Sequence, residues 1–289
     1  MTKRNAIIMA AGTSSRFVPL SAERPKGLIE VKGEVLIERQ IRQLQEAGIN
    51  DITIVVGYKA EMFEYLKGKY GVNIVMNEDF ARFNNTSSVI RVIDKLDNTF
   101  VCSSDNYFPK NVFMAESADS YYSALYADGE TGEYCLTTNE DNQIVDVSVG
   151  GKDSWYMVGH VFFSHEFSEA FRNLMKEEYE KDETKQGYWE DLFIKHIDNL
   201  PRMKINRYKE SEIKEFDSID ELRLFDESYK TDTRSKVVKY ICKVLGVREE
   251  KICRFKNIKH AGDYLLFSFN VGEDTYIYSS ENGVKIEKQ

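Results

Sequence analysis

The segment between Asn5 and Lys26 constrains the fold of this chain more than any other stretch. It begins with an apolar run, residues 6–10, whose length and composition are typical of a buried parallel strand. The run passes into a loop of small residues, namely Ala11, Gly12, Thr13, Ser14 and Ser15. Such a loop lets backbone N–H groups approach phosphate oxygens. Because Arg16 and Lys26 can neutralise the phosphate charge, the segment predicts a triphosphate-binding site.

Strands and helices alternate along the first hundred residues. Further buried strands are expected at residues 51–57, 72–76 and 99–103, and amphipathic helices at residues 36–48, 62–70 and 89–96. Strands separated by helices of this length indicate an α/β fold with a three-layer, Rossmann-like and mostly parallel sheet. Ligands of such sheets bind at the carboxyl ends of the strands. We therefore expect the Gly12 loop, the pair Gly57 and Tyr58, and Ser104 along one edge.

The pattern changes after about residue 120. A hairpin is expected at residues 134–149, a strand at 155–163, helices at 166–181 and 189–197, and an edge strand at 203–208. Further on, Ser218 is a good helix N-cap with Glu221 three residues later, which is the pattern of a capping box. This box predicts where the side chain of Asp217 points.

Composition excludes several classes of protein. The chain of 289 residues has a net charge of -9, which argues against nonspecific nucleic-acid binding. Its four cysteines lie far apart and form no C-x-x-C pair, so reduced thiols are expected. No signal peptide and no apolar stretch long enough to insert into a membrane is apparent. We expect a cytoplasmic protein without a nucleic-acid partner.

The first segment resembles the signature of nucleotidyltransferases that activate phosphorylated substrates with NTP. The matching positions are Ala10, Ala11, Gly12, Arg16, Pro19, Leu20, Pro25 and Lys26. This chain has Ser14 at the second loop glycine, where a positive φ would cost serine roughly 1 kcal/mol. The resemblance implies that residues 11–15 bind the nucleotide and that Arg16 and Lys26 are catalytic. The alternative is an ordinary strand, loop and helix whose two cations lie on the surface.

Two carboxylates are candidate metal ligands. Asp105 follows the strand expected at 99–103, where an acid is either a turn residue or a ligand of Mg²⁺. Magnesium is held by one or two carboxylates together with water and phosphate oxygens. The nucleotidyltransferase resemblance implies that Asp105 and Asp217 hold Mg²⁺, with Asp191 as the other candidate for the second ligand.

From Ala6 to about Tyr229 the chain resembles the bacterial CTP:phosphocholine cytidylyltransferases. The resemblance rests on short motifs at residues 26–31, 36–41, 56–58, 83–88, 104–107 and 188–191. It implies direct attack of phosphocholine on the α-phosphorus of CTP, assisted by Mg²⁺, to give CDP-choline and pyrophosphate. Phosphoethanolamine, 2-aminoethylphosphonate or a sugar 1-phosphate are alternative acceptors. A non-catalytic nucleotide sensor is an alternative of a different class.

Aromatic and acidic residues in the second half suit a quaternary ammonium group. Such a cation binds aromatic faces, each giving about 0.5–2 kcal/mol, and carboxylates. The candidates are Tyr107, Tyr134, Trp155, Tyr188, Trp189, Glu190 and Asp191. The alternatives are that the aromatic residues belong to the core and that the two acids cap a helix.

Polar side chains near residue 85 are candidates for reading the base. Asn85 and Ser87 offer hydrogen-bonding groups for a pyrimidine, and Gly57, Tyr58 and Ser104 are expected near the nucleotide. The alternative is a polar loop with a helix N-cap at Ser87.

The sequence predicts a nucleotidyltransferase domain at residues 1–229 and a small α+β appendage at 230–289. The appendage weakly resembles the start of a choline kinase N-terminal lobe, in a helix at 237–246 and strands at 264–271 and 275–278. That family's glycine loop falls near residues 261–264, where its Thr and Asn are lacking, so no kinase activity is expected. A dimerisation or lid element is one interpretation, and a homodimer stays open.

Overall fold

The computed structural model describes residues 3–115, 117–262 and 264–289. Contacts divide the chain into two compact units, Met1–Gly12 with Leu36–Lys214, and Thr13–Val35 with Glu215–Gln289. The boundary expected after residue 229 stays a prediction, and this division instead groups the appendage with residues 13–35. The choline-kinase-like loop includes Asp263, which lies outside the described residues.

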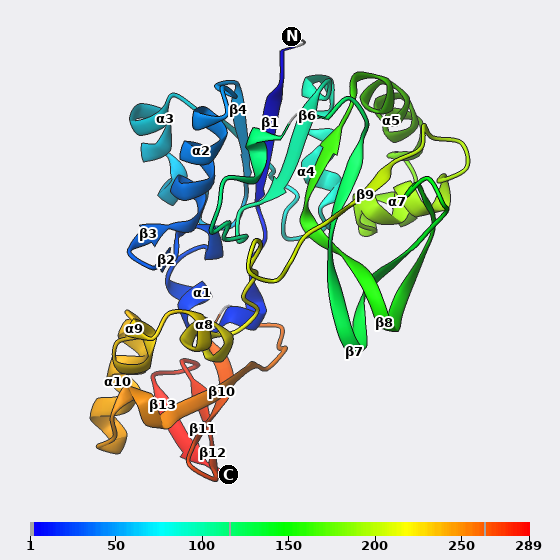
Figure 1. Ribbon diagram of the computed structural model, residues 1–289. Coiled ribbons are helices and arrows are strands. Elements are labelled where there is room, and N and C mark those ends of the chain that lie inside the picture. Colours follow the sequence, from blue (N-terminus) through cyan, green and yellow to red (C-terminus); the bar gives the residue numbers. More distant parts are fainter. Residues whose placement is uncertain (1–2, 116, 263) are drawn as a thin grey trace. The chain divides into compact units, whose positions relative to one another are not determined.

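A seven-stranded sheet forms the first unit, in the order β5-β4-β1-β6-β8-β7-β9 (Figure 1). Its strands are β1 (Asn5–Ala10), β4 (Ile52–Val56), β5 (Asn73–Met76), β6 (Thr99–Ser103), β7 (Tyr121–Thr138), β8 (Ile144–Phe163) and β9 (Lys204–Arg207). Neighbouring strands are parallel except at the β6–β8 and β8–β7 pairs. The predicted strands and the mostly parallel three-layer α/β fold are confirmed.

Helices connect and cover these strands. They are α2 (Leu36–Glu46), α3 (Tyr65–Tyr70), α4 (Thr86–Ile90), α5 (His165–Glu178), α6 (Asp182–Gln186) and α7 (Trp189–Lys195). The single helix expected at 89–96 is wrong. Val92 leaves the helical conformation at φ -126°, so α4 ends and a separate 3-10 turn, Ile93–Lys95, follows.

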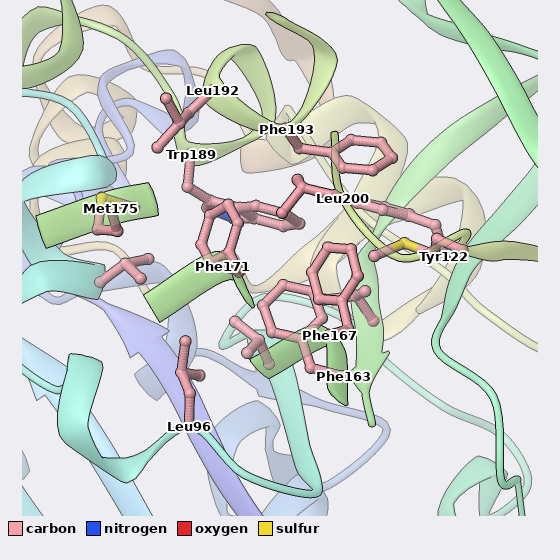
Figure 2. Packing of buried hydrophobic residues seen from close by; sticks show 14 of the residues in the cluster. Leu96, Tyr122, Phe163, Phe167, Phe171, Met175, Trp189, Leu192, Phe193 and Leu200 are labelled. Atoms are coloured by element: carbon pink, nitrogen blue, oxygen red, sulfur yellow. The ribbon is translucent and has the colours of Figure 1, made fainter. Parts of the chain in front are cut away.

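One face of the sheet carries the main hydrophobic core. Side chains alternate between the faces of a strand, so Ile7, Val55 and Val101 point to this core while Ile8 and Ile54 point to the other face. Figure 2 shows the aromatic centre of the core, which includes Phe163, Phe167, Phe171, Trp189 and Phe193. Strand β8 and helices α5 and α7 therefore pack together through aromatic rings.

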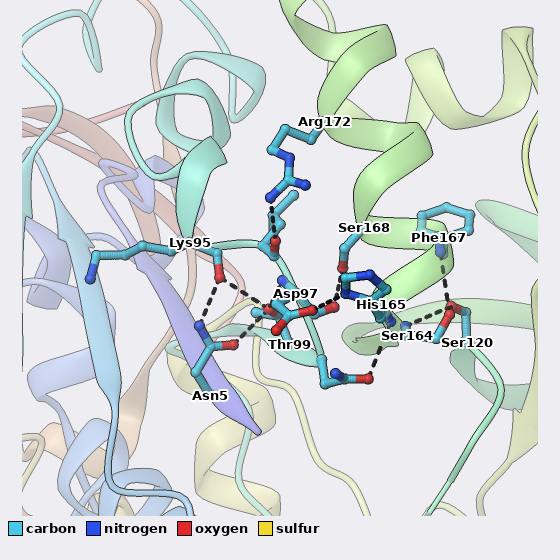
Figure 3. Close-up of polar contacts among 12 residues, drawn as sticks. Asn5, Lys95, Asp97, Thr99, Ser120, Ser164, His165, Phe167, Ser168 and Arg172 are labelled. Carbon is cyan, nitrogen blue, oxygen red and sulfur yellow. Dashed lines mark hydrogen bonds and ion pairs between the residues drawn. The ribbon is translucent and has the colours of Figure 1, made fainter. Parts of the chain in front are cut away.

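A polar network fixes the start of α5 (Figure 3). Ser164 caps the helix by accepting a hydrogen bond from the N–H of Phe167 at 3.3 Å. The Oγ of Ser120 accepts one from the N–H of Ser164 at 2.8 Å, and His165 pairs with Asp97 through its Nδ1. These contacts hold α5 against β7 and the loop that precedes β6.

The β7–β8 hairpin is longer than predicted, because the strand expected at 155–163 continues from the hairpin without a break. Its turn is stabilised by Asn139, whose Oδ1 accepts hydrogen bonds from the N–H groups of Asp141 at 3.1 Å and Gln143 at 2.9 Å. Irregular pairing at several positions bends the two strands.

The second unit contains α1 (Leu20–Glu23), the short strands β2 (Glu30–Val31) and β3 (Glu34–Val35), and the helices α8 (Ile219–Phe225), α9 (Ser228–Thr231) and α10 (Lys236–Leu245). Its antiparallel sheet has the order β10 (Ile252–Asn257), β11 (Leu266–Val271), β12 (Asp274–Ser279) and β13 (Lys285–Lys288). The predicted helix and two strands are confirmed, whereas β10 and β13 were not predicted. Within the described residues, no helix combines the length and apolar character that crossing a membrane requires.

Candidate active site

The carboxyl ends of β1, β4 and β6 meet at one edge of the sheet in the first unit. The N–H of Tyr58 donates to the carbonyl of Ala11 at 3.1 Å, and the N–H of Ser104 donates to that of Met9 at 3.1 Å. Gly57 permits this approach, since a Cβ there would lie 2.9 Å from the Ala11 carbonyl oxygen and 2.6 Å from Phe80. The edge expected from the sequence is therefore present, and Asp105 follows Ser104 on it.

Asn77 is a residue of this edge that the sequence analysis missed. It follows β5, its side chain is fully buried, and its Nδ2 donates to the hydroxyls of Ser87 and Ser88 at 2.9 Å each. The sequence signal that could have identified Asn77 is a polar residue directly after a buried strand. Because Ser87 also donates to the carbonyl of Asn84 at 2.7 Å, its hydroxyl is used within the protein. The N-cap of α4 is Asn85, so the alternative of a cap at Ser87 is wrong.

Asn85 connects α4 to the start of α7. Its Oδ1 accepts from the N–H of Trp189 at 2.8 Å, and its Nδ2 donates to Glu190 at 3.1 Å. The hydroxyl of Tyr122 donates to the other oxygen of Glu190 at 3.0 Å. Burial raises the pKa of Glu190 to about 7 against the lowering effect of these bonds. We call Asn85, Tyr122 and Glu190 the α7 cluster.

Trp189 belongs to the hydrophobic core, which differs from the ligand contact expected for it. Its side chain is 3% exposed and stacks on Tyr122 with ring centroids 5.7 Å apart. Phe163 and Phe171 pack edge-on against it at 5.3 and 5.8 Å (Figure 2). The described structure therefore leaves the indole no exposed face for a cation, and the core alternative holds for this residue.

Asp191 caps the start of α7. One oxygen accepts from the N–H of Tyr188 at 2.8 Å, and the other accepts from the hydroxyl of Tyr134 at 2.7 Å. This bond and burial raise the pKa of Tyr134, with burial the larger cause. The helix-capping alternative therefore describes Asp191, while Tyr188 is 46% exposed beside it.

Two further aromatic candidates already face arginine side chains. The guanidinium of Arg207 lies 5.4 Å from the ring centre of Trp155, and that of Arg39 lies 4.7 Å from the ring centre of Tyr107. Tyr107 is also 8% exposed. Of the seven candidate acceptor residues, the structure brings Tyr134, Tyr188, Trp189, Glu190 and Asp191 together around the start of α7.

In the second unit, both signature cations approach the predicted metal ligand Asp217. Its carboxylate lies 2.8 Å from Nη1 of Arg16 and 3.5 Å from Nζ of Lys26. Lys26 is buried at 6% exposure, whereas the Arg16 side chain is 76% exposed. We call these three residues the phosphate cluster.

The local conformation around the phosphate cluster follows the sequence pattern. Ser218 caps α8, accepting from the N–H of Glu221 at 3.1 Å, and Glu221 accepts from the N–H of Asp217 at 2.9 Å. The N-cap predicted at Ser218 is confirmed, but the reciprocal bond of a capping box is shifted by one residue, because Glu221 accepts from the N–H of Asp217 and not from that of Ser218. This shifted bond fixes the chain at Asp217. Ser14 adopts φ 50°, the left-handed conformation in which glycine is favoured. This is the strained conformation considered for the serine that replaces the signature glycine.

Comparison with known proteins identifies the family. Residues 6–181 match the model of the MobA-like NTP transferase domain. The chain belongs to this family. A choline-phosphate cytidylyltransferase of Streptococcus pneumoniae is 35% identical over 227 residues, which cover 78% of this chain and 99% of that protein. A 2-aminoethylphosphonate cytidylyltransferase of Lancefieldella rimae is 35% identical over 231 residues, covering 78% of this chain and 94% of the relative.

Solved structures support the same assignment of this NTP transferase. The structure of a CTP:phosphocholine cytidylyltransferase from Streptococcus pneumoniae matches with a TM-score of 0.75, at 35% identity and over 78% of this chain and 99% of that one. An inositol-1-phosphate CTP transferase from T. maritima matches with a TM-score of 0.60 at 17% identity, over 80% of this chain and 95% of that one. The second match shows the shared fold alone.

Asp105 and Asp217 are single carboxylates, the kind of ligand that Mg²⁺ takes together with water and phosphate oxygens. In the described parts of the chain, no group of three or more His, Cys, Asp or Glu side chains is arranged to hold a metal ion. Asp105 is partly buried, and the Asp217 side chain is 36% exposed. Single oxygen ligands of this kind fit Mg²⁺, which keeps several waters and takes phosphate oxygens from its substrate.

Proposed function

We propose that this NTP transferase is a cytidylyltransferase that condenses CTP with phosphocholine to give CDP-choline and pyrophosphate. The observation that carries the proposal is the phosphate cluster, in which two cations and a carboxylate from the nucleotidyltransferase signature and the α8 cap converge. The named activity of the pneumococcal relative, matched over 99% of its length, supports CTP and phosphocholine as substrates.

In the proposed reaction, a phosphate oxygen of phosphocholine attacks the α-phosphorus of CTP, and the bond to pyrophosphate breaks. The nucleophile is already an anion at neutral pH, so no side chain is needed as a general base. Arg16 and Lys26 stabilise the charge that grows on the phosphates, Arg16 as a planar fork and Lys26 as a compact charge. Asp105 and Asp217 would hold Mg²⁺, which would neutralise repulsion between the two phosphorylated substrates.

The α7 cluster and its neighbours are the proposed acceptor site. Tyr134 and Tyr188 offer aromatic surface, and Glu190 offers a carboxyl group whose pKa of about 7 lets a bound cation favour the ionised form. Proposed nucleotide contacts are the backbone of residues 11–15, Gly57, Tyr58, Asn85 and Ser104. All four cysteines are free, which supports the proposal of a reducing, cytoplasmic location.

A specific observation favours 2-aminoethylphosphonate as a second candidate acceptor. Trp189 is buried, which removes one aromatic face from the candidate ammonium site. A primary ammonium group donates hydrogen bonds, so it depends less on aromatic faces and more on oxygen acceptors. The relative from Lancefieldella rimae has the same 35% identity to this chain.

The test is pyrophosphate release by the full-length protein with Mg²⁺ and CTP. Phosphocholine is compared with phosphoethanolamine, 2-aminoethylphosphonate and glucose 1-phosphate, and CTP with the other three nucleoside triphosphates. We expect the highest kcat/KM with CTP and phosphocholine. A preference for 2-aminoethylphosphonate would replace the acceptor, and absence of release with every pair would refute nucleotidyl transfer.

A further inference from the structure

Glu23 lies in α1, within residues 13–35, which we call the signature segment and which also carry Arg16 and Lys26. Its carboxylate accepts three hydrogen bonds from the start of α10, from Ser235 Oγ at 2.5 Å, Lys236 N at 3.0 Å and Val237 N at 3.1 Å. The first N–H groups of a helix have no partner within the helix, and a negative charge at this end is stabilising. The Glu23 side chain of the signature segment therefore caps a helix that begins more than two hundred residues later in the chain.

Contacts on the other side of Lys26 involve the same part of the chain. The carboxylate of Asp226 accepts from the N–H of Lys32 at 2.7 Å. The hydroxyl of Tyr229 donates to the carbonyl of Glu30 at 2.6 Å, and the guanidinium of Arg234 lies 4.2 Å from the Tyr229 ring centre. Residues 226–237 thus bind the signature segment both before and after Lys26.

The phosphate cluster is held at both of its ends. The 3-10 turn Ser15–Phe17, which carries Arg16, packs against β10. Helix α8, which begins just after Asp217, is tied to the same region by Arg223, which is 8% exposed. Its guanidinium donates to the carbonyl of Ile252 at 2.5 Å and to that of Glu249 at 2.9 Å. The position of Arg16 relative to Asp217 therefore depends on the C-terminal part of the chain.

We propose that residues 226–289, which we call the C-terminal brace, hold the signature segment in the conformation that binds the CTP phosphates, with Glu23 as the positioning residue. This inference rests on the proposed function, since it assigns the segment to CTP. The pneumococcal relative is matched over 99% of its length by 78% of this chain, so about a fifth of this chain has no counterpart there. Positioning the signature segment is a role that such extra residues can fill.

We expect the C-terminal brace to affect the binding of CTP and not the binding of the acceptor. The Glu23 carboxylate binds the start of α10, and its removal frees the segment that carries Arg16 and Lys26 to move. A displacement of about 1 Å at a reacting group lowers rates by up to about a hundredfold. We therefore expect Glu23→Gln to lower kcat/KM for CTP by about ten- to a hundredfold and to leave the KM for the acceptor within about twofold.

The matched control is Glu249→Gln in the same full-length protein. Glu249 is also a partly buried carboxylate, and it accepts from the N–H and the hydroxyl of Thr233 at 2.6 Å each. Both partners lie within the brace, so this variant weakens the brace without removing a bond to the signature segment. Ser235→Ala, which removes one of the three bonds to Glu23, is the milder variant if Glu23→Gln does not fold.

Two measurements decide the proposal. The first is the CTP and acceptor dependence of pyrophosphate release, taken well below the melting temperature of each variant. The second is amide hydrogen exchange of residues 13–35, which we expect to be faster in Glu23→Gln than in Glu249→Gln. Equal effects of the two variants on both measurements, or no change in Glu23→Gln, would overturn the brace. If the unmodified protein transfers no nucleotide, the proposed function fails, and the exchange of residues 13–35 still decides the inference.

Discussion

The phosphate cluster and the α7 cluster both combine acidic and hydrogen-bonding side chains, but water reaches them to different extents. In the phosphate cluster the side chains of Arg16 and Asp217 are 76% and 36% exposed. In the α7 cluster Tyr122 is 3% exposed, and burial raises the pKa of Glu190 to about 7. The Arg16–Asp217 pair of the first cluster is thus open to water although Lys26 beside it is buried, and the second cluster is a hydrogen-bonded network of half-buried side chains around the buried Tyr122.

This difference separates the residues that serve ligand binding from those that also serve the fold. An exposed ion pair contributes only about 0–1 kcal/mol to stability, because water and salt screen it. A buried hydrogen-bonded group costs about 1–3 kcal/mol when its partner is lost. Substitutions of the exposed Arg16 and Asp217 should therefore change activity with little change in stability, and substitutions in the α7 cluster should change both.

The largest expected effect is that of Asp217→Ala. The change removes a proposed Mg²⁺ ligand and the carboxylate that approaches Arg16 and Lys26, so we expect kcat/KM for CTP to fall by about 10²–10³-fold. The free energy of unfolding should change by less than about 1 kcal/mol. Pyrophosphate release and chemical denaturation measure the two quantities.

Asp274→Ala is the matched control for Asp217→Ala. Asp274 is an exposed acid of the same unit that lies 2.7 Å from Lys288. This variant should retain the activity of the unmodified protein. If Asp217→Ala keeps most of its activity, or if it unfolds the protein, the proposed separation between the clusters is wrong.

The second effect concerns Glu190 and pH. Its pKa rises from 4.5 to about 7 on folding, so between these values the carboxyl is protonated in the folded protein and ionised in the unfolded chain. The unfolded state then binds fewer protons, and the free energy of unfolding falls as pH rises from about 4.5 to 7, by up to roughly 3 kcal/mol. In Glu190→Gln this fall should disappear.

Denaturation at several pH values between 4 and 8 tests this prediction. Glu183→Gln is the control, because Glu183 is exposed and its bond to Lys195 lowers its pKa, with the opposite effect of pH on stability. An unchanged slope in Glu190→Gln would show that Glu190 is ionised in the folded protein, and the α7 cluster would then resemble the phosphate cluster.

Arg16→Lys is expected to act on CTP binding alone. Lysine keeps the positive charge but loses the planar pair of donors that a guanidinium offers to phosphate. We expect the KM for CTP to rise about tenfold, with no change in the KM for the acceptor. Arg202→Lys, at an exposed arginine 3.1 Å from Asp198, is the control and should behave as the unmodified protein. A change in acceptor KM would contradict the assignment of Arg16 to the nucleotide.

Features that depend only on residues close together in the sequence could be predicted. The buried parallel strands are continuous apolar runs, and the position of Asp217 follows from the N-cap at Ser218 and from the bond of Glu221 to the N–H of Asp217. Strand β10 was missed because irregular pairing between Cys253 and Lys256 interrupts the alternation that marks a strand. Strand β13 was missed because it is short and mostly charged.

Features that join distant parts of the chain were not predictable. The burial of Trp189 depends on Asn85 and Tyr122, which lie far from it in sequence. The cap that Glu23 provides to α10 joins residues more than two hundred positions apart. Local patterns identify an acid or an aromatic residue as a candidate, but the partner that decides its role comes from tertiary packing.

The smallest expected effect is a change in melting temperature at His165. It tests whether an exposed ion pair outside both clusters contributes as little to stability as the exposed Arg16–Asp217 pair of the phosphate cluster. His165 donates a hydrogen bond from Nδ1 to the Asp97 carboxylate (Figure 3), and this bond, followed by the carboxylate's negative charge, raises the pKa of His165 above 6.5. The pair therefore stabilises the fold below pH 6.5, and this contribution is lost as pH rises through the folded-state pKa. His165→Gln should lower the melting temperature slightly at pH 5.5 and leave it unchanged at pH 8.5. If His165→Gln and the unmodified protein have equal melting temperatures at pH 5.5, the His165–Asp97 pair contributes nothing to stability. If the melting temperature falls strongly at both pH values, the start of α5 depends on packing by the imidazole ring and not on its charge.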